Sequence, residues 1–360
     1  MKTGRTIQEL AAEVARQAAA KKDYVAPSRR IRLLEPNRLD LEGVGEFGVN
    51  PLFHEQLAGK LAIPQRYYDR MKEEAPTLLR DNVNYWLANR DDRNMVRTLD
   101  GKARAFLSDR FRPLDNADLA EAILPAIGHL ELQILSCEVT ERRLYIKAVD
   151  NRITKDVPKG TRMGDGSHKF FDTLSPAIVV SNSEVGCGAL AIETAVWTSA
   201  CTNLAIAAQH SMRKYHLGGK IGNGDTGEAV YNLLTDKTKR LTDAALWAQA
   251  RDLVAAAFNQ AKFDALVGEI AGMADQKIEQ SVVTAMDVTA KRFGFQDSEK
   301  VSVLQHLIEG GDLSRYGLFN AVTRTAEDVA DYDRATQFER FGGDIIELAP
   351  NDWKLIANPN

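Results

Sequence analysis

Pairs of alternating segments joined by tight turns constrain the fold of this chain more than any other feature. The sharpest pair flanks Asp100-Gly101, a dipeptide that supplies the positive φ angles of a two-residue type I′ turn. The three predicted hairpins are 94–99 with 102–107, 130–139 with 143–149, and 177–183 with 189–198. The glycines of Ser181–Leu190 fit no phosphate-binding spacing, and the turn of the third hairpin accounts for them. Successive hairpins predict an antiparallel sheet.

Helical patterns lie on both sides of these hairpins. Thr6 and Glu9 form a capping box for a predicted helix over 6–20, and Asn50-Pro51 begins another one. Further helices are predicted after Pro64 and over 78–87, 115–124, 229–261, 304–308 and 318–322, the last followed by a helix ending at Gly342-Gly343. A polar loop is predicted over 150–172 and a short strand over 344–348.

The order of these elements predicts an α+β protein, with a hairpin-rich antiparallel sheet region flanked by helices and a mainly helical C-terminal part. With 360 residues, the chain is long enough for two or three domains. We expect a mixed N-terminal region over 1–129, a hairpin-rich middle region over 130–223 and a helical region over 224–360.

Composition excludes several classes of protein. The net charge of -4 does not fit a globally basic protein that coats nucleic acid without selection, although a local basic face is compatible with it. No run approaches the roughly 18 apolar residues of a membrane helix, and the N-terminus lacks an apolar signal core. Cys137, Cys187 and Cys201 form no CxxC pair, which argues against a disulfide framework. These features predict a cytoplasmic protein.

Basic and aromatic residues gather on the first hairpin and in the segment 150–172. Lysine and arginine that follow a phosphate backbone, with aromatic faces on which bases stack, are typical of proteins that bind single strands. The predicted phosphate contacts and stacking residues are Arg97, Lys102, Arg104, Arg152, Lys155, Lys159, Phe106 and Phe170. Solvated strand faces and core aromatics would produce the same pattern.

Other functional readings rest on weaker patterns. Residues 56–71 could form a helix-turn-helix, but Glu73 and Glu74 follow it at once and weaken a basic recognition face. A metal-dependent hydrolase would use Asp91, Asp92, His168 or His216, and a metal site could combine Cys187, Cys201, His210 and His216. The spacing fits no known zinc pattern, so no metal, cofactor or catalytic residue is predicted and a binding protein is favoured over an enzyme.

Several short motifs occur in a characteristic order along residues 50–350. They are Leu57-Ala58-Gly59-Lys60-Leu61 with Ile63-Pro64, Phe111-Arg112-Pro113-Leu114-Asp115, Asn182-Ser183-Glu184 with Gly186 and Gly188, Cys201-Thr202-Asn203, His216 with Gly218, and Ser314 through Thr323. In this order they resemble a family of phage- and plasmid-encoded proteins of unknown function, from which the chain departs at Leu204, where a glycine would follow Asn203. The resemblance implies a mobile-element context and no particular active site.

Together these patterns lead to one functional expectation and two alternatives. We expect a phage- or plasmid-type protein that binds single-stranded DNA, with a role such as annealing in recombination or replication, and that assembles as a homo-oligomer. This comparison with annealing proteins rests on layout alone. One alternative is a self-assembling or host-protein-binding accessory protein without a nucleic-acid role, whose surface would come from the helices after Gly224 and the acidic residues Glu327, Asp328, Asp331 and Asp333. The other alternative is the metal-dependent hydrolase.

Overall fold

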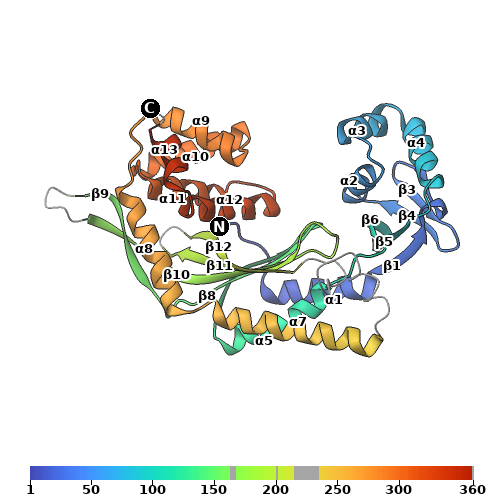
Figure 1. Ribbon diagram of the computed structural model, residues 1–360, viewed down its shortest axis with the longest axis horizontal. Coiled ribbons are helices and arrows are strands. Elements are labelled where there is room, and N and C mark those ends of the chain that lie inside the picture. The colour runs from blue at the N-terminus through green and yellow to red at the C-terminus, as the bar shows by residue number, and fades with distance from the viewer. Residues whose placement is uncertain (163–167, 200–201, 215–234, 359–360) are drawn as a thin grey trace.

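Two six-stranded sheets with helices packed on them make up this computed structural model, which describes residues 1–162, 168–199, 202–214 and 235–358. The predicted α+β class is therefore confirmed. Figure 1 shows the sheet built from the N-terminal part of the chain at one end of an elongated molecule, and the second sheet in its middle, between two layers of helices. No helix in the described ranges is long and apolar enough to cross a membrane.

The N-terminal sheet has the strand order β1-β5-β6-β4-β3-β2. Its strands are β1 (Lys22–Pro27), β2 (Ile31–Glu35), β3 (Arg38–Leu41), β4 (Gly45–Val49), β5 (Arg93–Leu99) and β6 (Lys102–Ser108), and the helices α2 (Pro51–Lys60), α3 (Gln65–Glu74) and α4 (Pro76–Ala88) supply the rest of its core. At the turn between β5 and β6, Asp100 has φ 51° and Gly101 has φ 74°, which confirms the predicted hairpin.

The central sheet has the strand order β12-β11-β10-β8-β7, and β9 pairs with β10 beyond the end of β8. Its strands are β7 (Gln133–Val139), β8 (Leu144–Val149), β9 (Lys155–Arg162), β10 (His168–Asn182), β11 (Leu190–Thr198) and β12 (Asn203–Lys214). All of its described pairs are antiparallel, and the second and third predicted hairpins are confirmed.

The polar loop predicted over 150–172 is wrong, because much of this segment forms a strand pair. We call β9 together with residues 168–174 of β10 the ribbon. Within it, Val157 and Leu174 are fully buried against the C-terminal helices, and these apolar anchors hold an otherwise polar strand in place. One buried valine in β9 leaves no alternating apolar pattern, so no strand could be predicted there. Figure 1 shows the ribbon extending away from the N-terminal sheet.

Helices cover both faces of the central sheet. On one face lie α1 (Ile7–Ala20), α5 (Asn116–His129) and α7 (Asp236–Ala256), whose buried residues share a core cluster with Ile178 and Val180 of β10. Ala177 and Val179, which alternate with them, belong to a different cluster with Tyr332 of α12. The helices of the C-terminal part are α8 (Gln260–Gly272), α9 (Val282–Phe293), α10 (Asp297–Gly310), α11 (Arg315–Thr325), α12 (Tyr332–Ile346) and α13 (Pro350–Ala357).

The packing divides the chain differently from the expected regions. Although α1 and α5 lie within the predicted region 1–129, both pack on the central sheet, and the core of the N-terminal sheet comes from residues between them. The N-terminal sheet is therefore an insertion between two helices of the central layer. The boundary predicted at 223/224 falls outside the described residues.

The predicted end of a helix at Gly342-Gly343 is wrong, as is the strand predicted over 344–348. Helix α12 continues through both glycines to Ile346, because the helix there lies directly against β12. A Cβ atom on Gly343 would lie 1.8 Å from the carbonyl oxygen of Ile206, so only glycine fits this contact. Arg315 then donates to the carbonyl oxygens of Ile345, Ile346 and Leu348 over 2.7–3.0 Å and satisfies the end of the helix.

Candidate nucleic-acid interface

Three of the eight predicted nucleic-acid contacts lie in the interior of the protein. Arg97 is 0% exposed, Arg104 is 5% exposed and Phe106 is 4% exposed. Strand β5 lies between β1 and β6 and is covered on both faces, so its alternation does not bring Arg97 to the surface. These three residues are therefore removed from the predicted interface. Lys102 is exposed beside the hairpin turn, on the N-terminal sheet.

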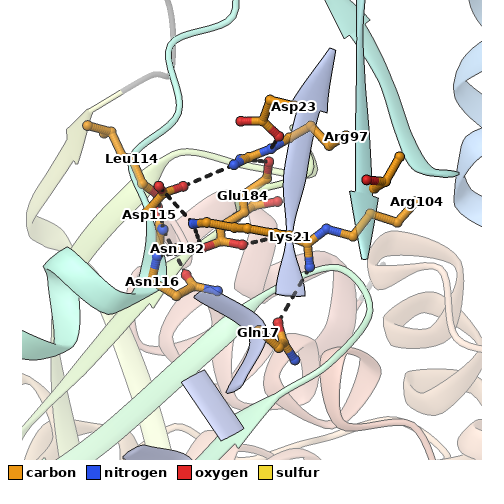
Figure 2. A network of polar contacts seen from close by, with 12 residues as sticks. Gln17, Lys21, Asp23, Arg97, Arg104, Leu114, Asp115, Asn116, Asn182 and Glu184 are labelled. Carbon is orange, nitrogen blue, oxygen red and sulfur yellow. Dashed lines mark hydrogen bonds and ion pairs between the residues drawn. The ribbon is translucent and has the colours of Figure 1, made fainter. Parts of the chain in front are cut away.

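Arg97 and Arg104 belong instead to a group of charges where the two sheets meet, in which both arginines and Glu184 are buried and Asp23 lies at the surface. Figure 2 shows the six charged side chains converging. This junction network consists of Lys21, Asp23, Arg97, Arg104, Asp115 and Glu184. Arg97 donates to Asp23 (2.7 Å), to Asp115 (3.0 Å) and to the carbonyl oxygen of Glu184 (2.7 Å). Three cations thus face three carboxylates.

Glu184 is the most buried carboxylate of the junction network, and it lies in the turn between β10 and β11. It pairs with Arg104 and with Lys21 (3.3 Å), and it accepts from the backbone N–H of Asn116 (2.7 Å). Burial alone would raise its pKa, but Arg104, Lys21 and the Asn116 N–H outweigh burial and hold the pKa of Glu184 below its usual value. Asp115 likewise has a lowered pKa, because Lys21 and Arg97 outweigh the effect of its burial.

These two lowered pKa values predict acid sensitivity. The stability contributed by Glu184 and Asp115 is complete above the pKa of unfolded carboxyls, about 4, and is lost as the pH falls through their lower folded values. We therefore expect the free energy of unfolding to fall between pH 5 and pH 3, in about the range where unfolded carboxyls begin to protonate. Urea unfolding at a series of pH values, compared with Glu184→Gln, measures this; an equal pH slope in the variant would contradict the assignment.

The other predicted contacts are one arginine that forms ion pairs within the protein and three residues on the ribbon. Arg152 lies between β8 and β9 and pairs with Asp150 (2.8 Å) and Glu131 (2.9 Å), so its guanidinium is engaged within the protein. Lys155, Lys159 and Phe170 all lie on the ribbon, where Lys159 faces Phe170 and Lys155 faces Leu174 across the strands. The structure thus brings together three of the eight predicted residues.

The ribbon presents two large aromatic side chains to solvent. Phe170 is 56% exposed and its neighbour Phe171 is 54% exposed. Because successive residues of a strand point to opposite faces, the two rings lie on opposite faces of the ribbon. The ion pair between Lys155 and the exposed carboxylate of Asp264 is long, at 3.4 Å. Lys159 forms a shorter ion pair, at 2.5 Å, with the buried Asp172. The ribbon therefore combines accessible aromatic faces with lysines on the pairing strand.

A cavity of about 120 Å³ lies beside the ribbon, between the central sheet and helices α10 and α11. We call it the polar cavity after the charged and amide side chains in its mainly apolar wall. Lys159 of β9, Asp172 of β10 and Asn203 of β12 line it from the sheet side. From the helical side it is lined by His306 of α10, by Asp312 between α10 and α11, and by Asn320 and Arg324 of α11. Apolar residues of the same two helices complete the lining. Asp172 and Asn203 are each 1% exposed and mark its inner end, while Arg324 is exposed.

Close packing keeps this cavity in place. Gly317 begins α11 against the preceding loop, where a Cβ atom would lie 1.7 Å from the carbonyl oxygen of Asp312. Asp172 is fixed from two sides, since Tyr316 donates to it at 2.9 Å and Lys159 pairs with it. The carboxylate of Asp312 accepts from the backbone N–H of Gly160 in β9 at 3.0 Å. The ribbon and α11 are thus joined around the cavity.

The candidate metal ligands are not brought together where the structure describes them. Asp92 pairs with Arg90 (2.7 Å) and Lys60 (3.0 Å), and these cations hold its pKa well below the usual range, with a further hydrogen bond from Ser28. No group of three or more His, Cys, Asp or Glu side chains among the described residues is placed to hold a metal ion. Cys201 and His216 lie outside the described residues, as do the side chains of His168 and His210.

Sequence reasoning missed most residues of the cavity. Asp172, His306 and Asp312 belong to no recognisable motif, and only the fold brings them together. Asn203 and Asn320, however, lie in two of the segments that carry the resemblance, so the shared order of those segments was a usable signal. No protein-family model matches the chain, and no curated protein or solved structure is significantly similar to it.

Proposed function

We propose that this protein binds single-stranded nucleic acid along the ribbon, through Lys155, Lys159, Phe170 and Phe171. The observation that carries the proposal is the pair of phenylalanines, each more than half exposed, on a strand whose partner carries the lysines. Aromatic faces of this kind stack bases of any sequence, and each stacked base contributes about 1–3 kcal/mol.

The charges of the ribbon favour modest, salt-sensitive binding. The ion pair between Lys155 and Asp264 is long and exposed, so a phosphate can replace the carboxylate at little cost. Lys159 remains partly exposed at 34% while it pairs with Asp172. With about two or three phosphate contacts, the logarithm of the binding constant should fall with the logarithm of salt concentration with a slope of about -1.5 to -2.

Fluorescence anisotropy with a single-stranded oligonucleotide across a salt series tests this proposal. We expect Phe170→Ala and Lys155→Glu each to weaken binding, the former by about 5-fold or more because a base stacked on the face that carries the lysines is lost. Matched controls exist elsewhere: Tyr85 of α4 is 63% exposed, and Lys102 is exposed on the N-terminal sheet. Tyr85→Ala and Lys102→Glu should leave binding unchanged, and equal losses in the controls would contradict a site on the ribbon.

The phage- or plasmid-type context and homo-oligomeric assembly remain parts of the proposal. Sizing of the complex by light scattering, with and without the strand, reports assembly. The alternative is a protein partner, for which the same exposed phenylalanines would serve as an apolar contact. Absence of strand binding at low salt, together with capture of one defined host protein that Phe171→Ala abolishes, would replace the nucleic-acid proposal by this alternative.

A further inference from the structure

Among the described residues, the lining of the polar cavity contains four buried polar atoms without hydrogen-bond partners. They are Asn203 Oδ1, Asp312 Oδ1, Asn320 Oδ1 and His306 Nδ1. Lys277 Nζ lies 3.7 Å from Asp312 Oδ1, too far for a hydrogen bond. Most buried polar atoms in proteins have partners, and four unsatisfied atoms around one cavity indicate that a ligand with several donors belongs there.

The orientation of these groups is set by their other contacts. Asn203 donates through Nδ2 to the carbonyl oxygen of Asn320 at 3.4 Å, which leaves Oδ1 as its acceptor toward the cavity. His306 Nε2 lies 2.7 Å from a carboxylate oxygen of Asp328, and its Nδ1 lies 3.9 Å from a carboxylate oxygen of Glu309, too far for a hydrogen bond. The cavity therefore offers acceptors, and its ligand has to supply N–H or O–H groups.

We propose that the polar cavity binds a nucleobase with an exocyclic amino group, a proposal that rests on the proposed function of the ribbon. Adenine and cytosine carry such an amino donor and thymine does not, and asparagine is a usual partner of adenine. The volume of about 120 Å³ suits one flat heterocycle. Phe170 lies on the same face of the ribbon as Lys159 and Asp172, which line the cavity, so a stacked base and an inserted base are neighbours.

Anisotropy with labelled oligo-dA, oligo-dC and oligo-dT of one length tests this proposal. We expect the wild type to bind oligo-dA and oligo-dC about 5-fold or more tightly than oligo-dT, because an amino group offers two N–H donors to the acceptors whereas thymine offers one, at N3. Asn320→Leu should bring all three to the affinity of oligo-dT. It should also raise the melting temperature of the ligand-free protein, because a buried unsatisfied acceptor is removed. Asn82 Oδ1 in α4 also lacks a partner, so Asn82→Leu is the matched control and should not change base preference.

The outcomes separate this proposal from the function of the ribbon. One outcome is salt-sensitive binding with equal affinity for the three oligonucleotides and no effect of Asn320→Leu. This outcome would overturn the base pocket and support strand binding by the ribbon. Binding of free AMP or CMP by calorimetry, abolished by Asn320→Leu while no strand binds, would support the pocket for a free nucleotide and overturn the ribbon. Absence of binding in both experiments would overturn both proposals.

Discussion

Replacing Arg97 with methionine is expected to lower the free energy of unfolding by about 3–5 kcal/mol, as for the removal of one member of a buried ion pair. The substitution keeps most of the side-chain volume but removes three hydrogen bonds, to Asp23, Asp115 and the carbonyl oxygen of Glu184. Asp23 would lose its partner in the junction network, and two cations would then face three carboxylates.

Urea unfolding followed by circular dichroism measures this effect. Arg80 provides the matched control, since its side chain on α4 is 42% exposed and, in the part of the chain that the structure describes, its ion pair is with its neighbour Asp81. We expect Arg80→Met to change the free energy of unfolding by less than about 0.5 kcal/mol. If Arg97→Met lowers the free energy of unfolding as little as Arg80→Met does, the junction network contributes little to the stability of the contact between the two sheets.

Replacing Lys147 with methionine is expected to cost a similar amount, about 3–5 kcal/mol. Lys147 of β8 and Glu339 of α12 form an ion pair with oxygen distances of 2.6 and 2.8 Å, and both side chains are fully buried. Burial lowers the pKa of Lys147, while Glu339 opposes that effect. The methionine would leave the Glu339 carboxylate buried without its cation.

A double-mutant cycle with Glu339→Leu distinguishes the pair from the burial of its members. Removing both charges places apolar groups of similar size at the contact between sheet and helix, a change that is often neutral or stabilising. We therefore expect the double variant to be more stable than either single variant. A double variant as unstable as the sum of the single losses would show that the two charges act independently.

The parts of the fold that depend on neighbouring residues in the chain could be predicted from the sequence. The Asp100-Gly101 turn and the capping box at Thr6 depend on neighbouring residues, and both are present as predicted. The ribbon was missed because its strand carries one buried apolar residue, and the end of α12 was misplaced because Gly343 serves close contact with β12. In both cases a distant part of the chain decides the local structure.

The candidate site was predicted only in part for the same reason. Lys155, Lys159 and Phe170 are local neighbours across one strand pair, and they do lie together. Arg97 and Arg104 alternate like surface residues, yet Glu184 of another hairpin lies against them and turns them into interior residues. A basic pattern in a sequence does not reveal whether its counter-charges come from solvent or from another part of the chain.

The insertion of the N-terminal sheet between α1 and α5 has a consequence for the order in which the chain folds during synthesis. The core of that sheet is complete when residue 108 has left the ribosome, but Leu10 of α1 packs in a cluster that extends to Val254. At about 5–20 residues per second, α1 waits roughly 10–50 s for the last of these partners. For that time its apolar stripe is accessible to chaperones and to other nascent chains, so a helix made before the N-terminal sheet is fully covered after it.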